Sequence, residues 1–126
     1  MPDMVQRKRT LILGASTNPA RYANMATHRL LSHGHEVELL GRRPGEVAGH
    51  AIRTSTGEIS RDIHTVTVYL SEENQEAYED YILDLKPQRV IFNPGAENPD
   101  FEEKLKAAGI EPIEACTLVM LATGQF

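Results

Sequence analysis

Short apolar runs alternate with amphipathic segments along the whole chain, an order typical of a parallel sheet covered by helices. The first run, Thr10–Leu13, is too short for a helix and apolar on both faces, as a central parallel strand should be. Gly14 follows it directly. The pattern predicts five such strands, over residues 10–13, 37–40, 65–70, 89–92 and 110–115.

Apolar residues at helical spacing predict a helix after the first, third, fourth and fifth of these strands. Asn98–Pro99 has the N-cap and first-turn proline that start a helix, and Ser71 is the expected N-cap of another. The segment 42–60 is rich in glycine and reads as a long loop with room for one short strand pair, although a helix there stays open. The helices are expected around residues 23–30, 72–85, 99–108 and 117–122.

Five parallel strands joined by right-handed crossovers predict an α/β fold of three layers, a Rossmann-like sheet with helices on both faces. The simplest strand order is 3-2-1-4-5, because the two halves then wind outward from the first strand. Ligands of such sheets bind beyond the carboxyl ends of the strands, at the point where the winding reverses. The expected site is therefore the crevice between the first and fourth strands.

Composition narrows the function classes. At 126 residues the chain is long enough for one domain, 1–126, and the net charge of -5 argues against a nucleic-acid or anionic membrane surface. A lone cysteine, Cys116, allows no internal disulfide, and a small buried residue is a better reading of it than a reactive thiol. Scattered histidines without further cysteines predict no metal site. We expect a cytoplasmic protein without a membrane span.

The strongest chemical signal is the loop Gly14–Arg21, where a strand end passes through small residues into a helix. Gly14 allows a tight turn, and the first N–H groups of a helix attract an anion, to which the hydroxyls of Ser16 and Thr17 can add donors. The dinucleotide fingerprint wants glycine where Ser16 and Pro19 stand, so NAD is disfavoured. A purely structural turn is the alternative.

Arg42 and Arg43 follow Gly41 at the end of the second strand, where a NAD-binding domain usually has an acid. An arginine pair suits a phosphorylated ribose, which both NADP and coenzyme A (CoA) contain. A solvated basic loop is the competing interpretation. After the fourth strand, Asn93 and Gly95 form a polar turn that predicts a second wall of the crevice, with Asn93 facing the ligand. A turn that satisfies its own backbone is the alternative there.

Taken together, these stretches resemble the CoA-binding domain family, Rossmann-type proteins similar to the nucleotide-binding domain of the succinyl-CoA synthetase alpha subunit. The resemblance covers nearly the whole chain. Where many relatives have Asn-Pro after strand two and prolines after strand three, this chain has Arg43–Pro44 and Ser71–Glu72. The residues that carry the resemblance to the family are Leu13–Ser16 with Asn18–Tyr22, Gly34–Val37 through Pro44 to Gly49, and Ile91–Glu97 with Gly109–Ile110 and Cys116.

The resemblance implies a role for each loop at this edge of the sheet. The first loop would hold the CoA phosphates with Gly14, Ala15, Ser16 and Arg21. The second would flank the adenosine end with Arg42, Arg43 and Pro44, and the third would line the adenine or ribose side with Leu70 and Ser71. Asn93 and Gly95 would border the crevice. The remaining candidate residues are Thr17, Asn18, Tyr22 and Gly41.

The functional prediction is a non-catalytic or accessory protein that holds CoA or an acyl-CoA, because the acyl-transfer machinery of the larger ligases lies in other regions. One alternative is an NADP-binding oxidoreductase-like domain, for which no Tyr-x-x-x-Lys arrangement is present. The other is a ligand-free interaction domain that forms a homodimer or binds a protein partner.

Overall fold

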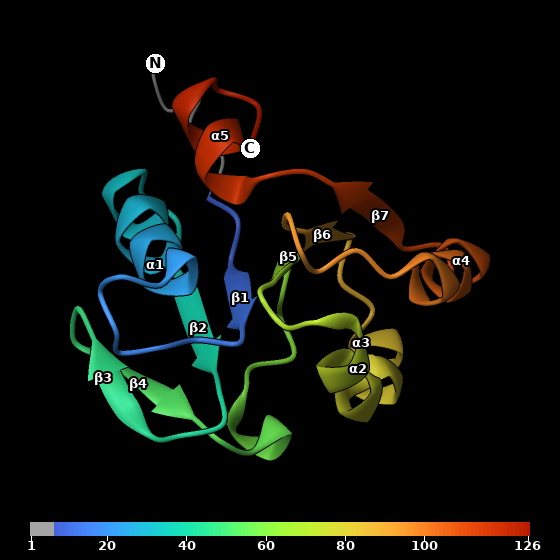
Figure 1. Cartoon of the computed structure of the whole chain (residues 1–126), viewed down its shortest axis with the longest axis horizontal. Helices are drawn as coiled ribbons and strands as arrows, with labels where there is room; N and C mark the ends of the chain where they lie inside the picture. Colours follow the sequence, from blue (N-terminus) through green and yellow to red (C-terminus); the bar gives the residue numbers. More distant parts are fainter. Residues whose placement is uncertain (1–6) are drawn as a thin grey trace.

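The computed structural model describes residues 7–126, which form a mostly parallel sheet with helices on both faces (Figure 1). Within these residues the sheet has seven strands in the order β3-β4-β2-β1-β5-β6-β7. All neighbours pair in parallel except β3 and β4, which form an antiparallel hairpin. The strands are β1 Thr10–Leu13, β2 Val37–Leu40, β3 Gly45–Val47, β4 His50–Arg53, β5 Thr65–Val68, β6 Arg89–Phe92 and β7 Glu111–Glu114.

The helices lie close to where the sequence predicts them. The cap of α4 is confirmed, since Asn98 Oδ1 accepts the backbone N–H of Phe101 at 3.2 Å. The helix expected over 72–85 is instead α2 and α3 with a 3-10 turn, Glu76–Tyr78, between them. Its acidic residues recur at helical spacing, and such like charges weaken a continuous helix. The helices are α1 Tyr22–Ser32, α2 Glu72–Gln75, α3 Glu79–Leu85, α4 Pro99–Ala107 and α5 Thr117–Ala122, and a further 3-10 turn covers Thr56–Glu58.

The predicted strand number and order are wrong. The third predicted strand, β5, pairs with β1 and does not lie outside β2. The place outside β2 belongs to the β3–β4 hairpin, which is the short strand pair allowed within the segment 42–60. Every residue of β5 is buried, which suits a strand between two others. The hairpin contributes two buried apolar side chains, Val47 and Ile52, to the core beside β2. The winding therefore reverses between β1 and β5.

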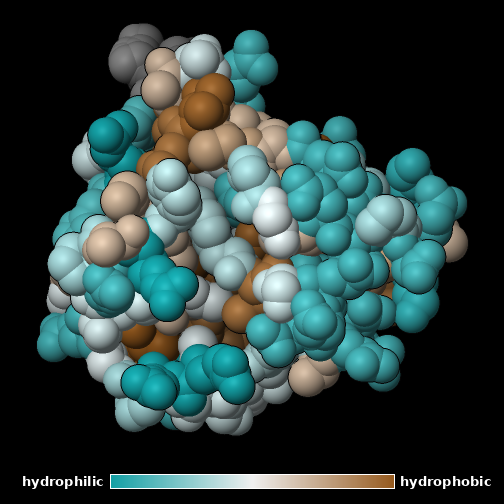
Figure 2. Space-filling view, in the orientation of Figure 1, coloured by the Kyte–Doolittle hydropathy of each residue, from teal (hydrophilic) through white to brown (hydrophobic). Residues whose placement is uncertain are grey.

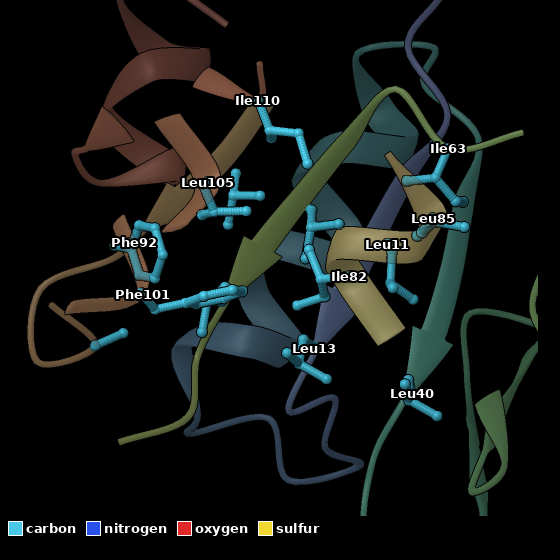
Figure 3. Close-up of a cluster of buried hydrophobic side chains, with 14 of the residues drawn as sticks. Leu11, Leu13, Leu40, Ile63, Ile82, Leu85, Phe92, Phe101, Leu105 and Ile110 are labelled. Atoms are coloured by element: carbon cyan, nitrogen blue, oxygen red, sulfur yellow. The ribbon is translucent and has the colours of Figure 1, made fainter. Parts of the chain in front are cut away.

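Two hydrophobic clusters, one on each face, hold the layers together. Leu11 and Leu13 of β1 point to the cluster under α3 and α4, which contains Phe92 and Phe101 (Figure 3). The two phenyl rings meet edge to face with centroids 5.9 Å apart. Ile12 points the other way, into the cluster covered by α1 and α5. The alternation along β1 confirms the prediction of a central strand covered by helices on both sides.

The surroundings of two histidines at the amino end of the sheet favour their neutral form. His35 Nδ1 accepts the backbone N–H of Lys8 at 3.0 Å, and His64 Nδ1 lies 2.7 Å from Thr65 Oγ1. Burial lowers the pKa of both imidazoles, and the charges of Lys8 and Arg89 lower it further. A proton on His35 Nδ1 would also replace the acceptor that the N–H of Lys8 needs.

Acidification is expected to destabilise the fold before the carboxylates titrate. Unfolded histidine binds a proton near pH 6.5, whereas folded His35 and His64 bind it at lower pH, so this stability is complete above about 6.5 and falls below it. The melting temperature should drop between pH 7.5 and 5.5, and the drop should be smaller in a His35→Gln, His64→Gln double variant. His28→Gln, on the exposed side of α1, is the control. An undiminished drop in the double variant would contradict this assignment.

Candidate functional site

A cleft of about 880 Å³ opens at the carboxyl edge of the sheet. Its walls are the loops after β1, β2, β5 and β6, and Figure 2 shows a hollow at this place with apolar residues inside it. The walls meet here because the carboxyl ends of parallel strands lie at one edge. In residues 7–126 no helix is long and apolar enough to cross a membrane, and no group of three metal-ligand side chains gathers.

The loop after β1 is anchored to β2 by its own backbone. Gly14 has φ +97°, and the N–H groups of Gly14 and Ala15 both donate to the carbonyl of Leu40, at 2.9 and 3.1 Å. These two donors are therefore not free for a ligand, contrary to a simple phosphate cradle built on Gly14. Among residues 7–126, no group accepts the N–H of Ser16, Thr17, Tyr22 or Ala23, and these are the open donors.

Side chains of the same loop keep its shape. Ser16 Oγ accepts the N–H of Asn18 at 3.0 Å, and Asn18 Oδ1 accepts the N–H of Ala20 at 2.9 Å. Asn24, buried on α1, donates from Nδ2 to the carbonyl of Ser16 at 2.9 Å. The amide of Asn24 thus ties the loop to the helix that follows it. The sequence offered no signal for this role, because the contact depends on how the loop folds back.

Two glycines allow the loop after β2 to pack against the loop after β1. A Cβ on Gly41 would lie 2.7 Å from the carbonyl oxygen of Ala15, and one on Gly45 would lie 2.5 Å from Thr17 Cγ2. Contacts below 3 Å do not occur for real Cβ atoms. Gly41 therefore lies against the backbone of the loop after β1 and does not line the cleft.

The cleft is electropositive in a protein with net charge -5. Arg21, Arg42 and Arg43 are among its lining residues, and no aspartate or glutamate is. Within the described part of the chain, none of these three arginines forms an ion pair, and all are exposed. The first turn of α1 carries no acidic residue either. The lining of the cleft therefore carries positive charge with no carboxylate among its residues to offset it.

The opposite wall is formed by the segments 69–71 and 94–96. Gly95 has φ +94° and donates its N–H to Glu97 Oε1 at 3.0 Å, outside the cleft. The Tyr69 hydroxyl is buried near Thr67 and Thr117 without a hydrogen bond of ordinary geometry to either. Burial raises the pKa of Tyr69 to about 12, so the phenol stays neutral at physiological pH.

Asn93 does not face the cleft, which corrects the sequence-based expectation. It is 2% exposed, and its Nδ2 donates to Thr67 Oγ1 at 2.7 Å and to the Val68 carbonyl at 2.9 Å. Its Oδ1 accepts the N–H of Thr117 at 2.8 Å. The amide therefore joins β5 and β6 to the start of α5, and its oxygen supplies the acceptor for the buried N–H of Thr117.

Most predicted site residues meet in this one cleft. Gly41 and Asn93 are the exceptions. The structure adds five lining residues that the sequence analysis did not select. Pro94 and Ala96 flank Gly95, and Ala23 and Tyr69 are next to selected residues. Ile52 lies in the segment 42–60, which was expected to be mainly a loop. Predicted residues that line the cleft are Gly14, Ala15, Ser16, Thr17, Asn18, Arg21, Tyr22, Arg42, Arg43, Pro44, Leu70, Ser71 and Gly95.

Comparison with solved structures shows that the fold recurs. The chain is 51% identical to an uncharacterized protein whose crystal structure superposes with a TM-score of 0.93, covering 96% of this chain and 99% of that one. The structure of cell-free ID.343 from Thermus thermophilus is 25% identical, with a TM-score of 0.85 and coverage of 96% and 92%.

A larger enzyme contains a similar fold. Dinucleotide-forming acetyl-coenzyme A synthetase 1 from Ca. Korarchaeum cryptofilum, solved with phosphate and ADP, has a TM-score of 0.71 at 14% identity. The match covers 89% of this chain and 26% of the synthetase, and at this identity it shows the fold alone.

Sequence comparison identifies the family. No curated protein matched the chain. The family model described as a CoA binding domain matches residues 8–122, which include all the residues that line the cleft. The chain therefore belongs to the CoA binding domain family.

Proposed function

We propose that the protein binds coenzyme A, free or acylated, in this cleft and serves as a non-catalytic or accessory CoA-binding protein, with residues 1–126 acting as one domain. The observation that carries the proposal is the cleft itself, which combines open backbone donors with three unpaired arginines in the described chain. Membership of the CoA binding domain family supports CoA as the anion that these groups would bind.

The pyrophosphate is assigned to the loop after β1. The open N–H groups of Ser16 and Thr17, and those of Tyr22 and Ala23 at the start of α1, can donate to phosphate oxygens. The positive end of the α1 dipole adds to this attraction, and Arg21 supplies a full charge beside it.

The adenosine end is assigned to the loop after β2. Arg42 and Arg43 can form charge-assisted hydrogen bonds to the 3′-phosphate, beside Pro44. Leu70 and Ser71 lie across the cleft and would contact the adenine or ribose. Gly95 would border the remaining length of the ligand.

The chemistry of the lining favours binding over catalysis. Its titratable residues are arginines and tyrosines, with no histidine, cysteine, aspartate, glutamate or lysine among the lining residues. Burial raises the pKa of Tyr69 to about 12, which disfavours loss of its proton near neutral pH. Histidine, carboxylates and lysine are the side chains that most often serve as a general acid or base, and none of them lines the cleft.

Calorimetric titration and thermal shift with CoA, dephospho-CoA, NADPH and NADH test the proposal. CoA should raise the melting temperature most, because a ligand at 100 times its Kd stabilises the native state by about 2.7 kcal/mol. Stabilisation by NADPH and not by CoA would favour the NADP-binding alternative. No response to any of the four would favour a ligand-free interaction domain, whose oligomeric state light scattering would then measure.

A further inference from the structure

Gln75, the last residue of α2, lies behind the wall formed by 69–71 and 94–96 and is 1% exposed. Its Nε2 donates to two carbonyl oxygens, that of Leu70 at 2.9 Å and that of Ala96 at 2.7 Å. Both carbonyls belong to residues that line the cleft, one on each of the two loops. One amide nitrogen thus holds both halves of the wall.

The orientation of this amide follows from chemistry. Carbonyl oxygens only accept, so the nitrogen of Gln75 must face Leu70 and Ala96. Its Oε1 then accepts from Asn98 Nδ2 at 3.0 Å, and Asn98 Oδ1 is left to cap α4 at the N–H of Phe101. Each amide hydrogen of Gln75 has one acceptor, and reversing either amide would set like atoms against each other.

Gln75 provides a direct polar link between the two wall segments. Within residues 7–126 no backbone hydrogen bond joins 69–71 directly to 94–96. The first segment is tied to the sheet by the N–H of Tyr69, which donates to the Leu13 carbonyl, and the second closes its own turn from Ala96 to Asn93. Only the side chain of Gln75 is seen to bridge the two loops with polar contacts in this part of the molecule.

We propose that Gln75 is a positioning residue of the cleft, which fixes the separation of the 69–71 and 94–96 segments and thereby sets the affinity for CoA. The inference rests on the proposed function. Gln75 does not contact the ligand; it acts through Leu70 and Ala96, whose carbonyls it holds. Binding sites lose affinity when the supporting contacts behind the lining residues are removed.

Gln75→Met tests the inference, because methionine is of similar length and donates no hydrogen bond. We expect the Kd for CoA to rise about tenfold or more, as the wall segments lose their common anchor. The Kd is measured by calorimetry well below the melting temperature. The matched control is Ile82→Val or Ile82→Ala, whichever lowers the melting temperature by the same amount as Gln75→Met. Ile82 is buried in the core on α3 and does not line the cleft.

Asn98→Asp provides a second variant in case Gln75→Met does not fold. Aspartate keeps the N-cap of α4 but cannot donate to Gln75 Oε1, so it removes the group that orients the amide. We expect the same direction of change, a weaker CoA complex, with α4 retained by circular dichroism.

The outcomes separate the two proposals. If the wild-type protein does not bind CoA, the proposed function fails. If the wild type binds and the Gln75 and Asn98 variants match the Ile82 control in Kd, the amide has only a structural role and this inference is overturned. A loss of CoA affinity in both variants, beyond that of the control, supports it.

Discussion

Replacing Arg42 and Arg43 together by alanine is expected to weaken CoA binding by roughly 10- to 100-fold and to leave dephospho-CoA binding nearly unchanged. Each hydrogen bond to a charged group contributes about 1.5–3 kcal/mol, and 1.4 kcal/mol is a factor of ten in Kd. Both side chains are exposed, so salt screening places the expected loss in this range and not above it. Calorimetric titration at two salt concentrations measures it.

A matched control removes two positive charges elsewhere. Arg29 on α1 and Lys106 on α4 are exposed and do not line the cleft, so an Arg29→Ala, Lys106→Ala variant changes the net charge equally. CoA affinity should be nearly unchanged in it. An equal loss of affinity for CoA and dephospho-CoA in the Arg42, Arg43 variant would indicate that these arginines contact the pyrophosphate and not the 3′-phosphate. No loss at all would make them a solvated surface pair.

Gly41→Ala is expected to damage both stability and binding. The added Cβ would lie 2.7 Å from the Ala15 carbonyl oxygen and 3.1 Å from Ile52 Cγ2, and Ala15 belongs to the loop after β1. Overpacking of this kind costs about 1–3 kcal/mol of folding free energy. Because the loop after β1 must move to relieve the contact, the Kd for CoA should rise by about tenfold or more.

Gly57→Ala is the control for Gly41→Ala. Its new Cβ would meet only Ser55 Oγ at 3.8 Å, and no positive φ is required there. Chemical denaturation gives the free energy of unfolding of both variants, and calorimetry gives their affinity for CoA. Equal stability and equal affinity in the two alanine variants would show that the contact between Gly41 and Ala15 does not position the loop.

The sequence predicts the elements of this fold better than their order. Strand and helix positions follow from local periodicity, so β1, β2, β5 and β6 start where they are expected to start. The place of β5 in the sheet depends on contacts that no local pattern contains, such as the bond between Thr67 of β5 and Asn93 beyond β6. The β3–β4 hairpin was expected only as one short strand pair within a loop, because its strands are short and Gly45 and Gly49 obscure their pattern.

The sequence predicts which loops surround the candidate cleft, because the fold alone determines where those loops lie. Loop tips after parallel strands gather at one edge whatever the strand order, so the residues around Gly14, Arg42, Leu70 and Gly95 meet in the cleft. The direction of a single side chain does not follow from such reasoning. Asn93 turns inward because distant groups need its amide, and the supporting roles of Asn24 and Gln75 depend equally on backbone atoms brought close by folding.

The Leu40 carbonyl, which accepts the N–H groups of both Gly14 and Ala15, should also affect how fast the proposed ligand associates. Since the Leu40 carbonyl, Asn18 and Asn24 fix the loop through hydrogen bonds within the protein itself, little conformational entropy would be lost on binding the proposed ligand. Association of the proposed ligand should therefore need no slow rearrangement of this loop. Differences in residence time among ligands then reflect how quickly each one escapes.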